Sequence, residues 1–338
     1  MKRVLLPLCF TLGLVAQSPW RVEKSGTQVE LRGLSVVNAK VAWASGMKGT
    51  VLHTVDGEHW KAMQVPGTEK LDFRDVEGID ANTAYVMSAG PGETSTIYKT
   101  TDGGTTWKLQ VTNPDKEGFW DAMAFWDSTH GMVFGDPVKE HFQALVTSDG
   151  GATWIPIQGP GALPNEGGFA ASGTCLSVWG SRDVWFATGG GKVSRVLHSG
   201  DRGKTWSAAE VPVPAAAPTK GLFSVAFLDA KHGVAVGGDY GKPGLGDLNG
   251  VRSEDGGRTW EPAQVLHGFM SVVVSVPGAR QTFVAAGLGG SAYSIDRART
   301  WTAMDSTPVN TVGFADPSTG WAVGPKGLLM KYVGRRLK

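Results

Sequence analysis

Short runs of apolar residues recur along almost the whole chain and are separated by Gly, Pro, Asp and Asn. The runs are rich in β-branched and aromatic residues, which is typical of β-strands, and no helix is signalled. Three runs follow one another in each unit of the sequence. The clearest first runs are 119–126, 223–228 and 309–315; second runs, 131–135, 184–188 and 233–237; third runs, 96–100, 144–148 and 195–199. We therefore predict an all-β protein.

A polar motif follows each third run and is best seen at residues 199–206, SGDRGKTW. Nearly complete copies lie at 100–107, 147–154 and 253–260; the copy at 294–301 lacks a glycine, and the copy at 54–60 is one residue shorter. Successive aspartates of the motif are 41 to 54 residues apart, which is the period of a four-stranded propeller blade. A solenoid of helices is excluded.

The residues of the motif suit a tight connection between two antiparallel strands. The aspartate accepts hydrogen bonds from the amides of the turn, and the glycines supply positive φ angles. The closing tryptophan offers a large apolar surface to the next blade. We expect less regular turns at Asp296, where Ala298 replaces a glycine, and at the short copy around Asp56.

The blade count requires a seventh blade. Three further runs (309–315, 320–323 and 327–332) follow the last motif, and the segment 20–23 reads like the strand that follows a motif elsewhere. We predict that this N-terminal strand completes the last blade and closes a seven-bladed β-propeller, which removes exposed sheet edges.

Seven tryptophans occupy one position of the repeat. Their equivalence predicts packing between blades for all seven, and an aromatic stripe that stacks on a ligand is the alternative. They are Trp20, Trp60, Trp107, Trp154, Trp206, Trp260 and Trp301.

The repeated motif resembles the Asp-box, or BNR, repeat of sialidase-like propellers, and the chain also fits the wider WD40 and YVTN group. The segments 119–127, 130–131, 135–137, 171–175, 185–190 and 237–240 are similar to bacterial proteins grouped with the photosystem II stability and assembly factor, Ycf48-like. The resemblance spans residues 20–333 and implies a chaperone-like scaffold that holds a partner protein. Photosynthetic members use an arginine-rich surface, whereas here only Arg32 and Arg74 fall near the expected site.

Composition and the N-terminus limit the organisation of the protein. Lys2 and Arg3 precede an apolar run, 4–15, and a small residue, Ala16, which is the pattern of a cleaved signal peptide at residues 1–16. Residues 17–338 then form one propeller, and we expect a secreted or periplasmic monomer with no membrane insertion. The 32 basic and 31 acidic residues argue against a nucleic-acid partner. No metal site is expected, because the seven histidines form no His-x-x-x-His pair and the mature chain keeps one cysteine, Cys175.

The candidate site lies on the face opposite the motif turns, where the connections from second to third runs and from one blade to the next meet. Aligning the first residues of the innermost strands places seven positions around the channel: Arg32, Arg74, Asp121, Thr174, Phe223, Ser271 and Asn310. Loops of the same face carry further polar groups. The predicted binding residues are Arg32, Arg74, Asp121, Asp136, Glu166, Asp239, Tyr240 and Lys242. A polar channel lining that is merely hydrated, and loop carboxylates that merely form turns, are the alternatives.

Three functions remain open. The first is a non-catalytic propeller that binds a protein and needs no cofactor. The second is a glycoside hydrolase acting on a glycan through Asp136, Glu166 and Asp239, although the arginine triad and Arg-Ile-Pro motif of sialidases are missing. The third is an oxidoreductase, the loose label of some relatives. The glycine runs 189–191 and 287–290 precede no predicted helix, which argues against a dinucleotide site.

Overall fold

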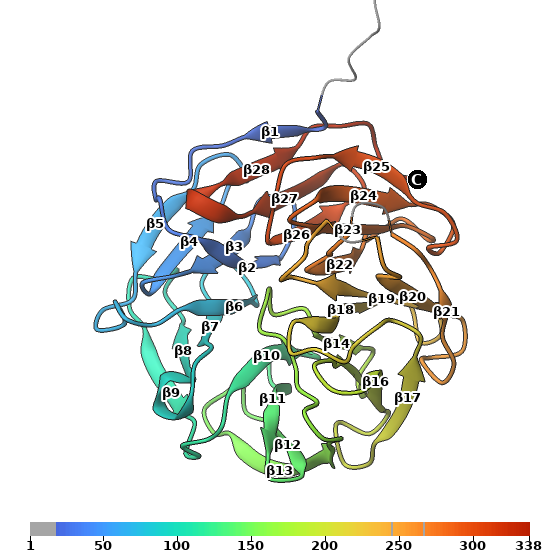
Figure 1. The fold of residues 1–338 in the computed structure, drawn as a ribbon. Helices are drawn as coiled ribbons and strands as arrows, with labels where there is room; N and C mark the ends of the chain where they lie inside the picture. The colour runs from blue at the N-terminus through green and yellow to red at the C-terminus, as the bar shows by residue number, and fades with distance from the viewer. Residues whose placement is uncertain (1–17, 245, 266–267) are drawn as a thin grey trace, which may run out of the picture.

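The computed structural model describes residues 18–244, 246–265 and 268–338, and shows seven four-stranded antiparallel sheets arranged in a ring (Figure 1). The all-β, seven-bladed propeller predicted from the repeats is confirmed. Within these residues there is no α-helix, only two short 3₁₀ turns, η1 (Gly92–Thr94) and η2 (Pro325–Gly327). Residues 1–16, the predicted signal peptide, lie outside the described residues.

Each sheet contributes one strand to each of four concentric positions. The innermost strands are β2 (Leu31–Val36), β6 (Phe73–Gly78), β10 (Trp120–Phe125), β14 (Leu176–Trp179), β18 (Lys220–Phe227), β22 (Val272–Ser275) and β26 (Thr311–Asp316). The second strands are β3 (Ala42–Gly46), β7 (Ala84–Ser88), β11 (Gly131–Val138), β15 (Asp183–Ala187), β19 (Gly233–Asp239), β23 (Phe283–Gly287) and β27 (Thr319–Val323).

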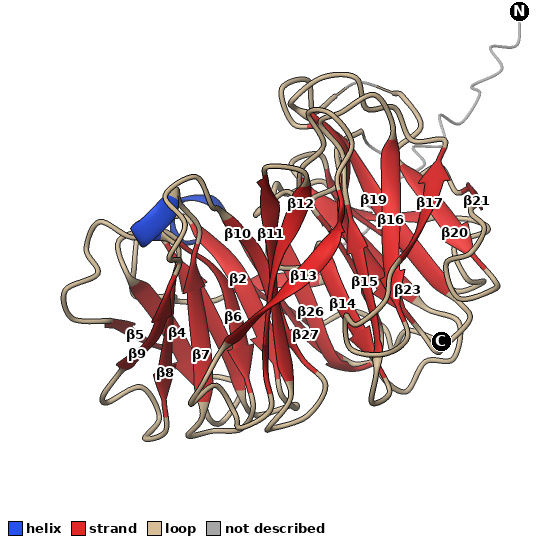
Figure 2. Cartoon of the chain, turned by 90° about the horizontal axis from the view of Figure 1, so that it is seen from below, coloured by secondary structure: helices blue, strands red, loops and turns tan. Residues whose placement is uncertain are grey.

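The third and outer strands complete the sheets, and the strands run between two faces that carry the connections (Figure 2). The third strands are β4 (Thr50–Thr54), β8 (Thr96–Thr100), β12 (His141–Thr147), β16 (Ser194–Ser199), β20 (Gly250–Ser253), β24 (Gly290–Ser294) and β28 (Leu329–Tyr332). The outer strands are β5 (Lys61–Gln64), β9 (Lys108–Thr112), β13 (Ile155–Gly161), β17 (Ser207–Val211), β21 (Glu261–Pro262), β25 (Thr302–Asp305) and β1 (Trp20–Val22).

The ring closes as predicted, because β1 pairs antiparallel with β28 at the rim (Figure 1). Trp20 lies opposite Tyr332, and its ring packs against the edges of Phe314 and Tyr332. The last sheet therefore combines the N-terminal strand with three C-terminal strands. This arrangement leaves β1, like the other six outer strands, at the circumference rather than at an open end of the array.

The motif tryptophans pack between blades, as their repeat position predicts. The core consists of seven clusters, and each contains one of the seven tryptophans together with side chains of two neighbouring sheets. Trp60, for example, meets Trp321 of the adjacent sheet edge-on at 6.0 Å between ring centroids. Trp20 is buried and the other six are partly buried, so the column serves the scaffold.

The aspartate of each complete motif organises its turn through several hydrogen bonds. Asp102 accepts bonds from the backbone N–H of Thr106 at 2.8 Å, from its hydroxyl at 2.6 Å and from the Thr100 hydroxyl at 2.9 Å. Asp296 accepts the same three kinds of bond, at 2.9, 2.6 and 2.8 Å, so the irregularity predicted for that turn is wrong as regards hydrogen bonding. The missing glycine is tolerated because Ala298 itself takes a φ of 62°.

The short copy differs, as expected from its missing residue. Asp56 accepts bonds from the backbone N–H groups of Glu58 and His59 and contacts the His59 ring, which takes the place of the threonine hydroxyl.

Candidate functional site

A cavity of about 540 Å³ opens at the centre of the ring, on the face opposite the motif turns. Six of the seven aligned channel positions line it; the seventh, Thr174, instead donates a hydrogen bond to Ser224 and lies beside Ser172. We call this cavity the mouth. Its lining residues at the aligned positions are Arg32, Arg74, Asp121, Phe223, Ser271 and Asn310.

One connection, residues 167–173, crosses the mouth and joins distant blades. It leaves the sheet of β13 and enters the centre of the ring as a yellow-green segment before β14 (Figure 1). Its Ala170 carbonyl accepts a hydrogen bond from Arg74 at 3.3 Å, and the Ser172 hydroxyl donates to the carbonyl of Ser271 at 3.0 Å. The segment therefore forms the wall of the mouth between three sheets.

The arginine side of the mouth is internally paired. Arg32 lies 3.0 Å from Glu30, and Arg74 donates to Asp72 at 2.8 Å. Asp72 also lies 3.9 Å from the Nε of Arg32, so one carboxylate is shared by two guanidinium groups. Both arginines are therefore held by carboxylates of their own blades.

The acidic side consists of Asp121 on β10 and Asp136 on β11. Asp121 is 1% exposed, and its Oδ2 has no hydrogen-bond partner within residues 18–244, 246–265 and 268–338. Asp136 accepts a hydrogen bond from the backbone N–H of Gly168 at 2.8 Å. Gly168 packs directly against Asp121 Oδ2, so a side chain at this position would overlap that oxygen.

The surroundings raise the pKa values of both carboxyl groups. Burial raises the pKa of Asp136 from 3.8 to about 6, and the Gly168 N–H opposes the rise. Burial, and then the nearby Asp136 charge, raises the pKa of Asp121 well above its usual range; the Arg74 guanidinium and the Ala170 N–H act in the opposite direction.

The aromatic side is a cluster of four rings. Phe169 stacks on Phe223 with centroids 3.8 Å apart, and Phe269 meets Phe223 edge-on at 4.8 Å. Tyr240 lies edge-on to Phe223 at 5.9 Å between ring centroids and is 48% exposed. Leu288 is a second exposed residue with an apolar side chain in the lining of the mouth. The mouth thus combines paired cations, unpaired carboxyls and an aromatic wall.

The remaining predicted site residues lie elsewhere. Glu166 is fully buried and accepts hydrogen bonds from Arg195 at 2.7 and 2.5 Å and from the Thr188 hydroxyl at 2.6 Å. It lines a separate cavity beside the β11–β12 hairpin. Asp239 caps its own turn through the Gly241 N–H at 2.9 Å and lines a third, very small cavity. Lys242 is exposed and lines none of the three.

Two of these carboxylates were predicted on loops and lie instead in strands. β11 continues to Val138 and β19 to Asp239, so Asp136 is inside a strand and Asp239 ends one. The register of β11 shifts between Gly135 and Pro137, and such a bulge accommodates a proline that cannot donate a ladder hydrogen bond. The strand therefore passes through a segment that reads as a turn.

Sequence reasoning placed Phe223 and Tyr240 at the site but missed the other two rings of the aromatic wall, Phe169 and Phe269, and the acids that pair with the arginines. Phe169 and Phe269 precede innermost strands in connections of the expected face, and this position was the available signal. Glu30 and Asp72 each lie two residues before the arginine that they bind.

Cys175 precedes β14 and is fully buried. Burial, followed by the charges of Asp121 and Asp75, raises the pKa of its thiol well above the usual range, so the reactive thiolate is disfavoured. Within the described ranges, no group of three or more His, Cys, Asp and Glu side chains is placed to hold a metal ion.

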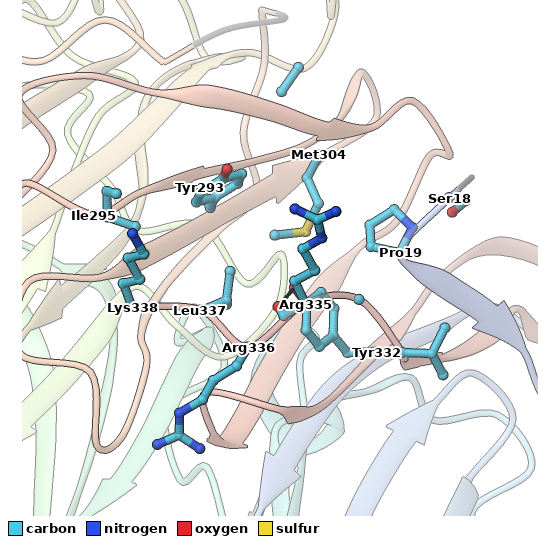
Figure 3. Close-up of a pocket in the computed structure, with 13 residues that line it drawn as sticks. Ser18, Pro19, Tyr293, Ile295, Met304, Tyr332, Arg335, Arg336, Leu337 and Lys338 are labelled. Carbon is cyan, nitrogen blue, oxygen red and sulfur yellow. Dashed lines mark hydrogen bonds between the residues drawn. The ribbon is translucent and has the colours of Figure 1, made fainter. Parts of the chain in front are cut away.

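A larger groove of about 920 Å³ lies at the rim, where the C-terminal segment passes β24 and β25 (Figure 3). Tyr293, Met304 and Tyr332 form its apolar floor, and Arg335 and Arg336 lie along it. It joins the first and last parts of the ring. The mouth is the better candidate site, because ionisable side chains of three blades, each partly or fully buried, line it together.

No protein-family model and no curated protein matches the sequence. Among solved structures, a YCF48 with a bound D1 peptide superposes with a TM-score of 0.69 at 18% identity, covering 94% of this chain and 98% of that one. YCF48 from Cyanidioschyzon merolae gives 0.65 at 17% identity, covering 93% and 98%. The WD40 domain of Neurospora crassa Pan2 gives 0.65 at 12% identity, covering 92% and 90%.

The likeness to YCF48 indicated by the sequence motifs is thus confirmed in the fold, over almost the full length of both chains. No helix in the described part of the chain is long and apolar enough to cross a membrane. What the comparisons establish is a seven-bladed propeller similar to YCF48.

Proposed function

We propose that this protein is a non-catalytic binding propeller, secreted or periplasmic, that holds a segment of a partner protein at the mouth and assists its assembly. The main support for this proposal is the lining of the mouth, where aromatic rings, carboxyl groups and guanidinium groups line one cavity of about 540 Å³. A peptide segment offers matching groups in one molecule, namely apolar side chains, charged side chains and backbone amides.

The comparison with YCF48 supports this proposal. A propeller of the same fold is described with a bound D1 peptide, which gives a precedent for peptide binding by this architecture. Transfer of that role to the present chain rests on the mouth, because fold alone does not determine function. Export rests on the pattern of residues 1–16 and is tested by N-terminal sequencing of the protein purified from its own cells.

The hydrolase predicted on Asp136, Glu166 and Asp239 has little geometric support, since these residues line three separate cavities. Asp121 and Asp136 keep hydrolysis as a second candidate, because both are carboxyls of the mouth with raised pKa values. Glycan hydrolysis that is lost in both Asp121→Asn and Asp136→Asn would favour it. An oxidoreductase is disfavoured, because the glycine runs at 189–191 and 287–290 lead into β16 and β24 rather than a helix.

Affinity capture from the cell envelope tests the binding function. The site variant is Tyr240→Ala with Leu288→Ala, since both side chains are exposed at the rim and can be truncated without opening the core. Val55→Ala with Leu109→Ala is the matched control, because these exposed apolar residues lie in a motif turn and on an outer strand.

A partner protein recovered with the wild type and the control, and at least tenfold depleted with the site variant, is the expected result. Equal recovery with both variants would move the binding surface away from the mouth. Recovery of no partner by the wild type would contradict the assembly function.

A further inference from the structure

The acidic side of the mouth differs from the arginine side in forming no salt bridge among the described residues. Arg32 and Arg74 are occupied by Glu30 and Asp72, whereas Asp121 and Asp136 have no basic group within 4.0 Å in the part of the chain that the structure describes. The mouth therefore contains more carboxyl groups than its own cations neutralise.

Asp121 carries a buried carboxyl oxygen that is not hydrogen-bonded within the described residues. It is 1% exposed, it lines the cavity, and its Oδ2 has no hydrogen-bond donor among the described residues. A buried carboxyl oxygen without a donor is costly, and such groups are normally satisfied. Because Asp121 lines the cavity, a donor from the cavity that reaches this oxygen would remove that cost.

The wall next to the carboxyls favours an organic cation. Phe169 follows Gly168, which contacts both carboxyl groups, and stacks on Phe223; Tyr240 and Phe269 complete the cluster. Aromatic rings attract ammonium and guanidinium groups through their quadrupoles and pack against the methylenes that carry them. Small inorganic cations gain little from such a wall.

We propose that the mouth binds a cationic side chain, lysine or arginine, of the partner segment, with its charge between Asp121 and Asp136 and its methylenes against the rings of Phe169 and Phe223. This proposal rests on the proposed function and specifies what the site recognises.

Binding should be coupled to proton release. Burial raises the pKa of Asp136 to about 6 and raises that of Asp121 well above its usual range, so both carboxyl groups hold a proton more strongly than free carboxyl groups do. A bound cation favours the ionised forms. Among the other ionisable groups, Arg74 lowers the pKa of Asp121. The Cys175 thiol stays neutral, because burial and then the Asp121 charge raise its pKa.

Calorimetric titration with short capped peptides tests the proposal. The probes are acetyl-Ala-Ala-Lys-Ala-Ala-amide, its arginine counterpart, and norleucine and glutamate versions that keep the length but change the charge. Titration of n-butylammonium chloride serves as the small-molecule arm. Repeating each titration in two buffers of different ionisation enthalpy gives the number of protons released.

The variants are Asp121→Asn and Asp136→Asn, which keep the side-chain shape, and Glu117→Gln is the control because it removes an exposed carboxylate that does not line the mouth. We expect the lysine or arginine peptide to bind at least tenfold more tightly than the norleucine peptide, with protons released. Each aspartate variant should weaken that binding at least tenfold and reduce the proton release, whereas Glu117→Gln should stay within twofold of wild type.

Equal binding of the lysine, arginine and norleucine peptides, or cation binding unchanged in both aspartate variants, would overturn the proposal. Partner capture that still depends on Tyr240 and Leu288 would then leave the binding function standing. Conversely, peptide and n-butylammonium binding that depend on Asp121 and Asp136, without any captured partner, would support the cation site and reject the protein-assembly function.

Discussion

Asp75 is a buried carboxyl group that links two blades, and it offers a direct test of the electrostatics of the channel. It lies on β6, is 4% exposed, and accepts a hydrogen bond of 2.6 Å from the backbone N–H of Met123 on β10. Burial raises its pKa from 3.8 to about 7, while the N–H groups of Met123 and Val76 oppose the rise.

The sign and size of the effect follow from proton linkage. Because the folded pKa exceeds the unfolded value, the folded state binds the additional proton between these values, and stability falls as the pH rises. The contribution of protonated Asp75 to the free energy of unfolding is fully present below pH 3.8 and is lost as the pH rises through about 7. A difference of about 3 pH units corresponds to about 4 kcal/mol at about 1.4 kcal/mol per unit.

The perturbation is Asp75→Asn, which keeps an acceptor for Met123 but cannot ionise. Free energies of unfolding are measured by guanidinium titration with tryptophan fluorescence at pH 4, 5.5, 7 and 8.5. We expect the wild type and the variant to differ little at pH 4, and the variant to gain up to about 4 kcal/mol relative to wild type by pH 8.5.

Glu77 contributes to the expected gain in stability of Asp75→Asn. Burial and then the charge of Asp75 raise the pKa of Glu77, and the variant removes that charge. Glu117→Gln, an exposed substitution, should leave the pH profile of stability unchanged. A difference between Asp75→Asn and wild type that is the same at all four pH values would refute the assignment of a raised pKa to Asp75.

Three other perturbations test the scaffold. The His53 ring stacks on that of Trp43 with centroids 3.5 Å apart, and burial lowers the pKa of His53 to about 4. The contribution of neutral His53 to the free energy of unfolding is therefore fully present above pH 6.5 and is lost as the pH falls through about 4. His53→Phe should match wild type at pH 7.5 and exceed it by about 2 kcal/mol at pH 4.5 in the same unfolding assay; equal acid sensitivity would contradict this. Arg195→Met should lower the free energy of unfolding by about 3–5 kcal/mol, because it leaves the buried Glu166 charge without its partner. Adding Glu166→Gln should restore much of the lost stability in thermal unfolding. No restoration would argue against the unpaired charge as the cause. Gly135→Ala should lower stability by about 1–3 kcal/mol, because its Cβ would overlap the carbonyl of Phe119, which directly precedes β10. A melting temperature equal to wild type would show that the bulge relaxes.

The fold was predictable because the same physical problem is solved in every blade. A tight turn needs a hydrogen-bond acceptor and residues that adopt positive φ, and the neighbouring sheet is covered by a large apolar side chain next to the outer strand. Residues equivalent to Asp102 and Trp107 therefore recur at a fixed spacing. Closure by Trp20 followed from counting strands. The errors arose where a local pattern was read without its tertiary context: Asp136-Pro137 is typical of a turn, but pairing with β12 keeps it extended.

The mouth was predictable only in part, because repeat position and burial are separate properties. Alignment placed Arg32, Arg74 and Asp121 around one channel, since equivalent residues of equivalent strands meet at the axis. It could not indicate that Arg74 would donate to a carbonyl 96 residues away, since that contact depends on how one connection folds across the ring.

That connection, residues 167–173, lies between the outer strand of one blade and the innermost strand of the next, and it shapes much of the mouth. Its glycine backbone encloses Asp121 and donates to Asp136, and its Phe169 begins the aromatic wall. In a ring of similar blades, the innermost strands all place side chains around the channel. A connection that covers some of these side chains determines which of them are buried and which can contact a ligand. Propellers that share this scaffold but differ in this one segment should therefore bind different groups, even where the residues at their channel positions are the same.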